Sequence, residues 1–365
     1  MFKIKRFLKI EWTLSLLLIT ALAFQLYAEK WFQSLENPLV LSVVSLCLLS
    51  VILLSAMRAT HQAEAIGAKI GEPFSTLILT LSVVFIEVGL IVIFMLTGKS
   101  NPTMARDTMF AVLMIVLNGL LGLGLVLGAL KHKEQSYNLK GVHAYFSVIM
   151  VVAVLGLILP NVTSSTEVGT LSHFQSYFLV GVSLSLFFAF LFVQTLAYRS
   201  YFISESSNAS HHSADFSLPV HLGLLIFYLL GVVFLAKKLS IPVDHAFVAF
   251  GLPEAFAGFV IALIILTPEA LGALRSAVAN QLQKSLNIFL GSVLATITLT
   301  LAAVIIISNL NSLDLVLGLS GSELVLLLLT LLVSINTFIS GQTSLLNGLI
   351  HLILFFAYVM LIFEP

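Results

Sequence analysis

Apolar runs of about 20 residues recur along almost the whole chain, and each is long enough to cross the hydrocarbon core of a bilayer as a helix. The runs are too long and too uniformly apolar for the strands of a membrane barrel. Charged residues make up only 9% of the chain, against roughly a quarter in a soluble domain. The sequence therefore predicts an all-α integral membrane protein of about 11 transmembrane helices. We expect these spans at residues 10–28, 38–57, 72–97, 107–130, 143–160, 171–198, 218–236, 245–270, 285–308, 322–338 and 345–363.

The distribution of basic residues predicts an orientation in the bilayer. With the N-terminus in the cytoplasm, 12 of the 17 lysines and arginines face the cytoplasm, in agreement with the positive-inside rule. Those on the outer side are Lys30, Lys99, Arg106, Lys237 and Lys238. An odd number of spans then places the C-terminus outside. Because the formal net charge is zero, no basic surface suggests a nucleic-acid partner, and the expected partner is the lipid bilayer.

A polar stretch, residues 204–215, interrupts the apolar runs after the sixth expected span. Its serines, histidines, asparagine and acidic residues are typical of a linker, so we expect two halves around a cytoplasmic connection. The expected boundaries are 1–37 for an N-terminal cytoplasmic segment with an extra first helix, 38–200 for the first repeat half, 201–217 for the linker and 218–365 for the second repeat half.

Two segments of the chain carry glutamates at matching positions. Glu72 and Glu87 bound the first segment, and Glu254 and Glu269 bound the second, with the same 15-residue separation. Because the segments lie in the third and eighth expected spans, an odd offset makes them run in opposite directions across the membrane. Inverted-topology repeats of this kind are typical of secondary transporters, whose sites lie near the midplane where the repeats meet. The sequence therefore predicts two inverted repeats of five helices after one extra N-terminal helix.

The inner glutamate of each segment is expected deep in the membrane. Fifteen helical residues rise about 22 Å, so Glu72 and Glu254 lie at entrances while Glu87 and Glu269 approach the interior. A carboxylate there costs several kcal/mol unless it is paired, hydrated or bound to an ion, so an ion-binding role is our first hypothesis for both. The alternative for Glu87 is a protonated carboxyl that hydrogen-bonds a neighbouring helix. For the two entrance carboxylates it is a hydrated charge at a helix end.

The two inner glutamates differ in their surroundings along the chain. Arg275 follows Glu269 by six residues, whereas Lys99 follows Glu87 by twelve, which indicates unequal depths. Thr267-Pro268 precedes Glu269, and a proline inside a helical run removes a hydrogen bond. We therefore expect the second segment to bend or to break within a protein-lined cavity.

Three stretches carry a resemblance to a known family: Gly71–Ser82, Ala105–Gly119, and Leu266–Ala270 continued by Gly291–Thr296. They resemble the calcium/cation antiporter superfamily, and specifically its bacterial calcium/proton branch, also described as sodium-potassium/proton antiporters. The resemblance implies one acidic ligand from each repeat, in a Gly-Asn-x-x-Glu type segment, and oxygen ligands from a Gly-Ser element on the next helix. It also implies a multi-pass protein of the bacterial inner membrane.

Glu87 and Glu269 occupy the acidic places of that pattern, and Gly291-Ser292 occupies the second Gly-Ser place. The first half departs from it, since Ala111-Val112 stands at the corresponding position, and neither glutamate follows Gly-Asn. Five polar residues at membrane depth are candidates for further oxygen ligands, although each type more often hydrogen-bonds between helices: Ser82, Asn118, Thr267, Ser292 and Thr296.

Other polar residues are expected to be structural. Asp107 beside Arg106 at a span entrance is expected to form a surface pair. Five histidines lie near span ends, where interfacial packing is the expected role: His143, His173, His221, His245 and His351. The single cysteine, Cys47, excludes an internal disulfide and a thiolate metal cage.

Two intramembrane carboxylates match the charge of a divalent cation that prefers several hard oxygen ligands. Protons compete for the same oxygens, so a site that holds either the cation or protons, and alternates between the two faces, exchanges them obligatorily. We expect an antiporter that exports cytoplasmic calcium for protons without a cofactor, with sodium or potassium as alternative cations. A cation channel is a rival from another class. An enzyme is disfavoured, since Gly-x-Ser-x-Gly, His-Glu-x-x-His and Walker motifs do not occur.

Overall fold

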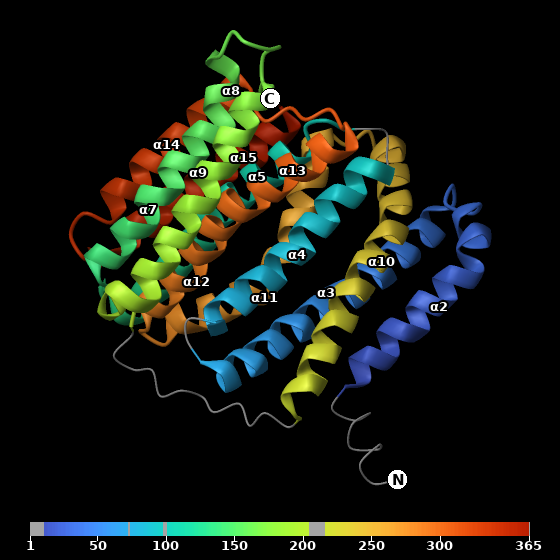
Figure 1. The fold of residues 1–365 in the computed structure, drawn as a ribbon, viewed down its shortest axis with the longest axis horizontal. Helices are drawn as coiled ribbons and strands as arrows, with labels where there is room; N and C mark the ends of the chain where they lie inside the picture. The colour runs from blue at the N-terminus through green and yellow to red at the C-terminus, as the bar shows by residue number, and fades with distance from the viewer. Residues whose placement is uncertain (1–10, 72–73, 98–100, 204–215, 365) are drawn as a thin grey trace. The chain divides into compact units, whose positions relative to one another are not determined.

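The computed structural model describes residues 11–71, 74–97, 101–203 and 216–364, and these residues form helices and one short antiparallel ribbon (Figure 1). The elements are α2 Trp12–Phe32, α3 Pro38–Ile70, α4 Phe74–Thr97, α5 Met104–Met114, η1 Ile115–Leu120, α6 Leu121–His132, β1 Gln135–Ser136, α7 Leu139–Ala153, η2 Val154–Ile158, α8 Leu159–Val162, α9 His173–Phe192, η3 Val193–Ala197, η4 Arg199–Tyr201, α10 Leu218–Phe250, α11 Glu254–Val278, α12 Leu282–Ala295, η5 Thr296–Thr300, α13 Leu301–Asn311, α14 Gly321–Thr337, β2 Gln342–Thr343 and α15 Leu345–Phe363. In the ribbon, Gln135 pairs with Thr343.

The predicted all-helical membrane fold is confirmed. Within the described residues, 10 helices are long and apolar enough to cross a membrane, and α14 is a shorter apolar helix at the position of the tenth expected span. The chain therefore has the extra first helix α2 and then two sets of five spans of opposite topology. The first set runs from α3 to α9 with its π-helical segments, and the second from α10 to α15.

The helices gather into two compact units. The first unit takes the described parts of Met1–Asn101 and His212–Glu254, which contribute α2, α3, α4 and α10. The second takes those of Pro102–His211 and Ala255–Pro365, with the remaining helices. Each unit draws spans from both halves of the sequence, so this division differs from the expected repeat halves.

Two matching long helices form the centre of the first unit. α3 and α10 each have 33 residues, which rise about 50 Å and exceed the roughly 30 Å hydrocarbon core. Each has a proline in its first turn and ends at a glycine with positive φ, 83° at Gly71 and 61° at Gly251. Glycine adopts this left-handed region without a Cβ penalty, so both helices end at a residue that takes this conformation without strain. α3 packs along α10, and α2 and α4 contact both.

The core of the second unit consists of the fourth and ninth spans. In an apolar stretch of 18 residues within each span, 78% of the residues are buried in Met104–His132 and 72% in Leu282–Asn311, against 28–44% in the other candidate spans. Each of these two spans contains a π-helical segment near its middle, η1 in one and η5 in the other. Such wide turns are rare and occur mostly at functional positions. The repeat therefore extends from the long helices through the glutamate helices to the buried π-helices.

Three expected span boundaries were wrong. The second span was expected to end at residue 57, yet α3 continues to Ile70. The seventh was expected to end at residue 236, before Lys237 and Lys238, and the eighth to begin at residue 245, yet α10 continues to Phe250 and α11 begins at Glu254. Long lysine stems can carry their charges along a helix towards polar surroundings, so a lysine pair does not end a span.

At Pro268 the sequence predicts a bend or a break. The break is absent, since α11 is continuous from Glu254 to Val278.

Candidate ion-exchange site

Glu87 lies near the middle of α4 in the first unit, and it is only 1% exposed. α4 packs against both long helices, α3 and α10. The contact with α10 is close next to the glutamate, because a Cβ added at Gly89 would lie 2.7 Å from Cγ2 of Val233. The chain therefore buries an ionisable carboxyl on a tightly packed helix, as the sequence predicts.

Ser82 is buried on the same helix but not on the same face as Glu87. Five residues at 3.6 residues per turn place the two side chains about 140° apart around the helix. The Ser82 hydroxyl donates to the carbonyl oxygen of Ile78 at 2.7 Å. Ser82 therefore satisfies its own helix, and nothing in this geometry directs it to the cation ligand role that we expected.

Glu269 lies on α11 in the second unit and is hydrogen-bonded to the next helix. The Ser292 hydroxyl on α12 donates to one oxygen of its carboxyl group. The other oxygen, Oε2, is buried and has no hydrogen-bond partner among the described residues. Because buried polar atoms are nearly always paired, an enclosed open oxygen marks a place for a proton, a water or a cation.

The turn before Glu269 offers a further oxygen. Pro268 has no N–H, so the carbonyl of Ile264 cannot accept the usual helical hydrogen bond from residue 268. The Thr267 hydroxyl is occupied, since it donates to the Leu263 carbonyl oxygen at 2.6 Å. The proline thus leaves the helix continuous but frees one backbone carbonyl, and Thr267 itself acts within the helix.

The remaining candidate ligands lie on the π-helical segments of the second unit. Asn118 in η1 is fully buried, and both ends of its amide are hydrogen-bonded to other side chains. Thr296 begins η5 and is 4% exposed. The amide of Asn118 is therefore already committed within the protein, in contrast to the open oxygen of Glu269.

The two entrance carboxylates are Glu72 and Glu254. Glu72 lies outside the described residues. Glu254 begins α11, and its side chain also lies outside what the structure describes. Of the predicted site residues, the structure brings Glu269 and Ser292 together in the second unit, whereas Glu87 and Ser82 belong to the first.

Asp107 was expected to pair with Arg106 at the surface; the pair is present, but Asp107 is buried and not at the surface. Asp107 is 4% exposed, and its carboxylate lies 2.7 Å from Nη2 of Arg106. Thr103 donates a further hydrogen bond at 2.8 Å, and Arg106 Nη1 reaches the Gly318 carbonyl oxygen at 3.0 Å. A buried carboxylate is tolerated where donors surround it in this way. The adjacent sequence positions showed the pair but not the packing that covers it.

Two histidines that were expected at the interface are buried in hydrogen-bond networks instead. His221 is 2% exposed and contacts Gln62, whose amide donates to the buried carboxylate of Glu11 at 2.8 Å. His351 is 0% exposed and contacts Asn118 and Thr337. Gln62 is 159 residues from His221 along the chain, and Asn118 is 233 residues from His351. Only the fold brings these residues together.

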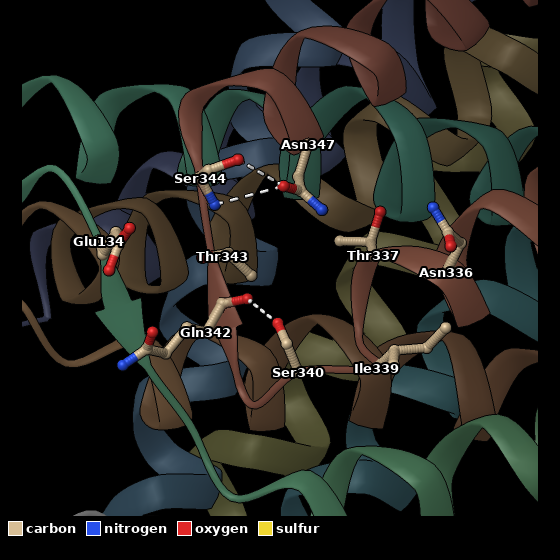
Figure 2. A pocket seen from close by; sticks show the side chains of 9 residues that line it. All are labelled: Glu134, Asn336, Thr337, Ile339, Ser340, Gln342, Thr343, Ser344 and Asn347. Atoms are coloured by element: carbon tan, nitrogen blue, oxygen red, sulfur yellow. Dashed lines mark hydrogen bonds between the residues drawn. The ribbon is translucent and has the colours of Figure 1, made fainter.

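A polar pocket of about 350 Å³ opens at one end of the second unit (Figure 2). It is formed where the chain after α6 meets the connection from α14 to α15. Figure 2 shows the hydroxyl of Ser344 donating a hydrogen bond to the side-chain oxygen of Asn347 in its lining. Its lining residues are Glu134, Asn336, Thr337, Ile339, Ser340, Gln342, Thr343, Ser344 and Asn347. None of the predicted site residues lines it.

Comparison with protein families finds one match over most of the chain. The model of the sodium/calcium exchanger protein family matches residues 38–196 and 220–364. ChaA of Escherichia coli (strain K12), a sodium-potassium/proton antiporter, is 37% identical over 341 residues, which cover 91% of this chain and 92% of ChaA. The protein y4hA of Sinorhizobium fredii, named as an ionic transporter, is 40% identical over 325 residues, or 88% of this chain and 89% of y4hA.

Solved structures share the fold at lower sequence identity. Native YfkE superposes with a TM-score of 0.71 at 17% identity, covering 97% of this chain and all of YfkE. The H⁺/Ca²⁺ exchanger CAX gives a TM-score of 0.64 at 15% identity, covering 94% of this chain and 88% of CAX. The helical architecture described above is therefore shared with proteins of known structure along nearly their whole length.

Proposed function

The chain belongs to the sodium/calcium exchanger protein family, and from this premise we propose that it is an antiporter that exports cytoplasmic calcium in exchange for protons. The observation that supports exchange at a carboxylate is the state of Glu269. One of its carboxyl oxygens accepts a hydrogen bond from Ser292. The other, Oε2, is buried and has no hydrogen-bond partner among the described residues. A proton or a cation can complete this carboxyl group, and the two compete for the same oxygen.

Glu87 is the matching carboxyl of the first repeat, since it is buried on α4 at the position that corresponds to Glu269 on α11. We propose that both glutamates bind the transported cation and release protons when it arrives. Two carboxylates neutralise a divalent cation, and neutral oxygens such as Ser292 Oγ and the Ile264 carbonyl complete its preference for hard ligands. Calcium is also supported by the related folds of YfkE, described as a Ca²⁺/H⁺ antiporter, and CAX.

Sodium or potassium is the second candidate for the transported cation. It is favoured by the 37% identity with ChaA, which is named for these ions. The proposed setting is the bacterial inner membrane, with the N-terminus in the cytoplasm and the C-terminus outside. In that orientation the proton gradient drives protons inward and the cation outward.

The test uses everted membrane vesicles that carry an imposed proton gradient. Glu87→Gln and Glu269→Gln keep the size of the side chain but remove its charge, so we expect each to reduce cation-dependent proton release to background. Glu167→Gln, at an exposed position between α8 and α9, is the matched control and should behave as wild type. Full activity of both inner-glutamate variants would contradict the proposed mechanism.

Separate titrations with calcium, sodium and potassium decide between the two cation assignments. A lower KM for calcium than for either monovalent ion supports calcium export, and the reverse order supports the alternative. Flux that does not saturate, or that continues without an opposing proton gradient, would contradict exchange altogether and favour a channel.

A further inference from the structure

His351 is a titratable side chain buried at membrane depth for which the proposed exchange mechanism has no use. It is the seventh residue of the 19-residue helix α15, and its exposed fraction is 0%. α15 packs against η1 and α6, which belong to the most buried span of the second unit. A polar ring in such a place requires partners, because an unsatisfied buried polar group costs about 1–3 kcal/mol.

Both ring nitrogens of His351 have side-chain partners. Nδ1 lies 3.1 Å from Oδ1 of Asn118, and Nε2 lies 3.1 Å from the hydroxyl of Thr337. Asn118 lies in η1, and Thr337 is the last residue of α14. A single side chain thus joins α15 to α14 and to the π-helical segment of the fourth span.

The partners of Asn118 determine which nitrogen of the ring carries the hydrogen. Asn118 Nδ2 donates to the hydroxyl of Thr330 at 2.8 Å, and that hydroxyl in turn points to the sulfur of Met114. Oδ1 is then the acceptor that faces the ring, so Nδ1 of His351 donates to it. Nε2 is left as an acceptor for the hydroxyl of Thr337. This arrangement is satisfied completely by a neutral imidazole.

The π-helical geometry explains why such a clamp is needed. A π-helical turn shifts the backbone hydrogen bonds of a helix and leaves carbonyl groups without their usual partners. His351 supplies a donor to the side chain of Asn118, which lies in the middle of η1. Without this contact, η1 has less to hold it in the wide turn.

The clamp is connected to the candidate ion-exchange site through one helix. η1 packs against α12, and α12 carries Ser292, whose hydroxyl donates to Glu269. A change in the course of η1 therefore moves the helix that orients this donor. The residues that link them lie in one compact unit, so each step is a contact within it.

We propose that His351 is a positioning residue of the antiporter, which holds Asn118 and η1 in place and so sets the cation affinity of the Glu269 and Ser292 pair. It acts as a neutral donor and acceptor, and it touches neither the cation nor the proton that is exchanged. This inference rests on the proposed exchange function. It also reassigns Asn118 from a candidate cation ligand to a partner of His351.

The test compares three substitutions in the vesicle assay. His351→Leu keeps most of the volume and removes both hydrogen bonds. His351→Asn is smaller but places an amide nitrogen where Nδ1 stood, so it can still donate to Asn118. His351→Gln reaches the place of Nε2 and keeps the contact with Thr337 only.

We expect His351→Leu to raise the cation KM about tenfold, since it leaves the buried amide oxygen of Asn118 and the buried hydroxyl of Thr337 unpaired, while the maximal rate changes less. His351→Asn should restore the KM to within about threefold of wild type, because a preserved hydrogen bond avoids that penalty. His351→Gln should resemble His351→Leu. A role in packing alone predicts the opposite order, with the volume-preserving Leu nearer to wild type than Asn, and that order would overturn the proposal.

A second measurement keeps the test decisive if one variant folds poorly. In a double-mutant cycle, Asn118→Leu together with His351→Leu should raise the KM no more than the larger single change, and additive effects would contradict the link between them. Elution as a single species in detergent establishes that each variant folds. Wild-type vesicles without cation-dependent proton release would contradict the proposed function, whereas wild-type exchange with an unchanged KM in His351→Leu would contradict only the positioning role.

Discussion

Two of the π-helical segments of the second unit, η1 and η5, occupy matching places in the repeat, but their central polar side chains have different kinds of partner. η5 follows directly after the helix that carries Ser292, and its central hydroxyl, that of Thr298, donates back to the Leu294 carbonyl within the same span. η1 has Asn118 instead, and its polar contacts come from α14 and α15. The central hydroxyl of η5 is therefore partnered within its own span, whereas the central amide of η1 is partnered by distant parts of the chain.

The glutamates of the two repeats differ in the same sense. Glu269 has a serine partner on the following helix, and the position that matches Ser292 in the first half is the buried, apolar pair Ala111-Val112. The repeat thus preserves backbone features, namely a long helix, a glycine turn, a glutamate helix and a π-helical segment. The polar side chains on the following helix are different in each copy.

The largest expected effect follows from removing the partner of Glu269. Ser292→Ala deletes the donor to the carboxylate, and hydrogen bonds to charged groups contribute about 1.5–3 kcal/mol, so the cation KM should rise about tenfold or more. Ser292→Thr keeps a hydroxyl and should stay near the wild-type value. Cation-dependent proton release in vesicles measures both.

Val112→Ser is the matched change in the first half and tests the asymmetry directly. Val112 is 0% exposed, and a serine at this position can satisfy its hydroxyl on its own helix, so we expect little change in KM. If Val112→Ser and Ser292→Ala altered the KM equally, the two halves would contribute to the site in the same way and the comparison would fail.

A smaller effect is expected where η1 and α6 approach α15. A Cβ at Gly348 would lie 2.8 Å from the carbonyl oxygen of Gly122 and 2.8 Å from the backbone nitrogen of Val126. Backbone atoms cannot move aside as a flexible side chain can, so Gly348→Ala should destabilise the protein by about 1–3 kcal/mol. The measurement is the apparent melting temperature of the purified protein in detergent.

Gly181→Ala is the control for that change, because a Cβ at Gly181 in α9 meets no atom within 4 Å. Alanine is the better helix former, so this variant should melt at the wild-type temperature or slightly above it. Equal melting temperatures for Gly348→Ala and wild type would show that the contact between α6 and α15 is looser than the structure indicates, and would weaken the account of how η1 is held.

The backbone features of this comparison were largely visible in the sequence, and the polar contacts were not. Matching glutamates separated by five spans predicted opposed repeats, because apolar length and glutamate spacing are local properties of the chain. The approach of His351 to Asn118 joins residues 233 positions apart, and no local pattern encodes it. The π-helical segments were also missed, since their apolar residues fit an ordinary helix equally well.

Burial of charge was misjudged for a related reason. Arg106 and Asp107 are neighbours at a span entrance, and adjacent opposite charges are usually solvated. Gly258 lets α11 approach so closely that a Cβ there would lie 2.7 Å from the Asp107 backbone, which covers the pair. The end of α10 was missed because hydrophobicity reports where a helix meets lipid, and a helix can continue beyond that point.

The smallest expected effect concerns Thr298 of η5, whose hydroxyl is partnered within its own span. Thr298→Val removes a fully buried hydroxyl but keeps the shape of the side chain, and the Leu294 carbonyl that it releases is 2.6 Å away in the same helix. Replacing a buried polar contact by an apolar group of the same shape changes stability by less than about 1 kcal/mol. We therefore expect a melting temperature and a cation KM close to wild type, in contrast to Asn118→Leu. A loss in Thr298→Val as large as that in Asn118→Leu would show that η5 also depends on contacts outside its own span, and that the two segments are held alike.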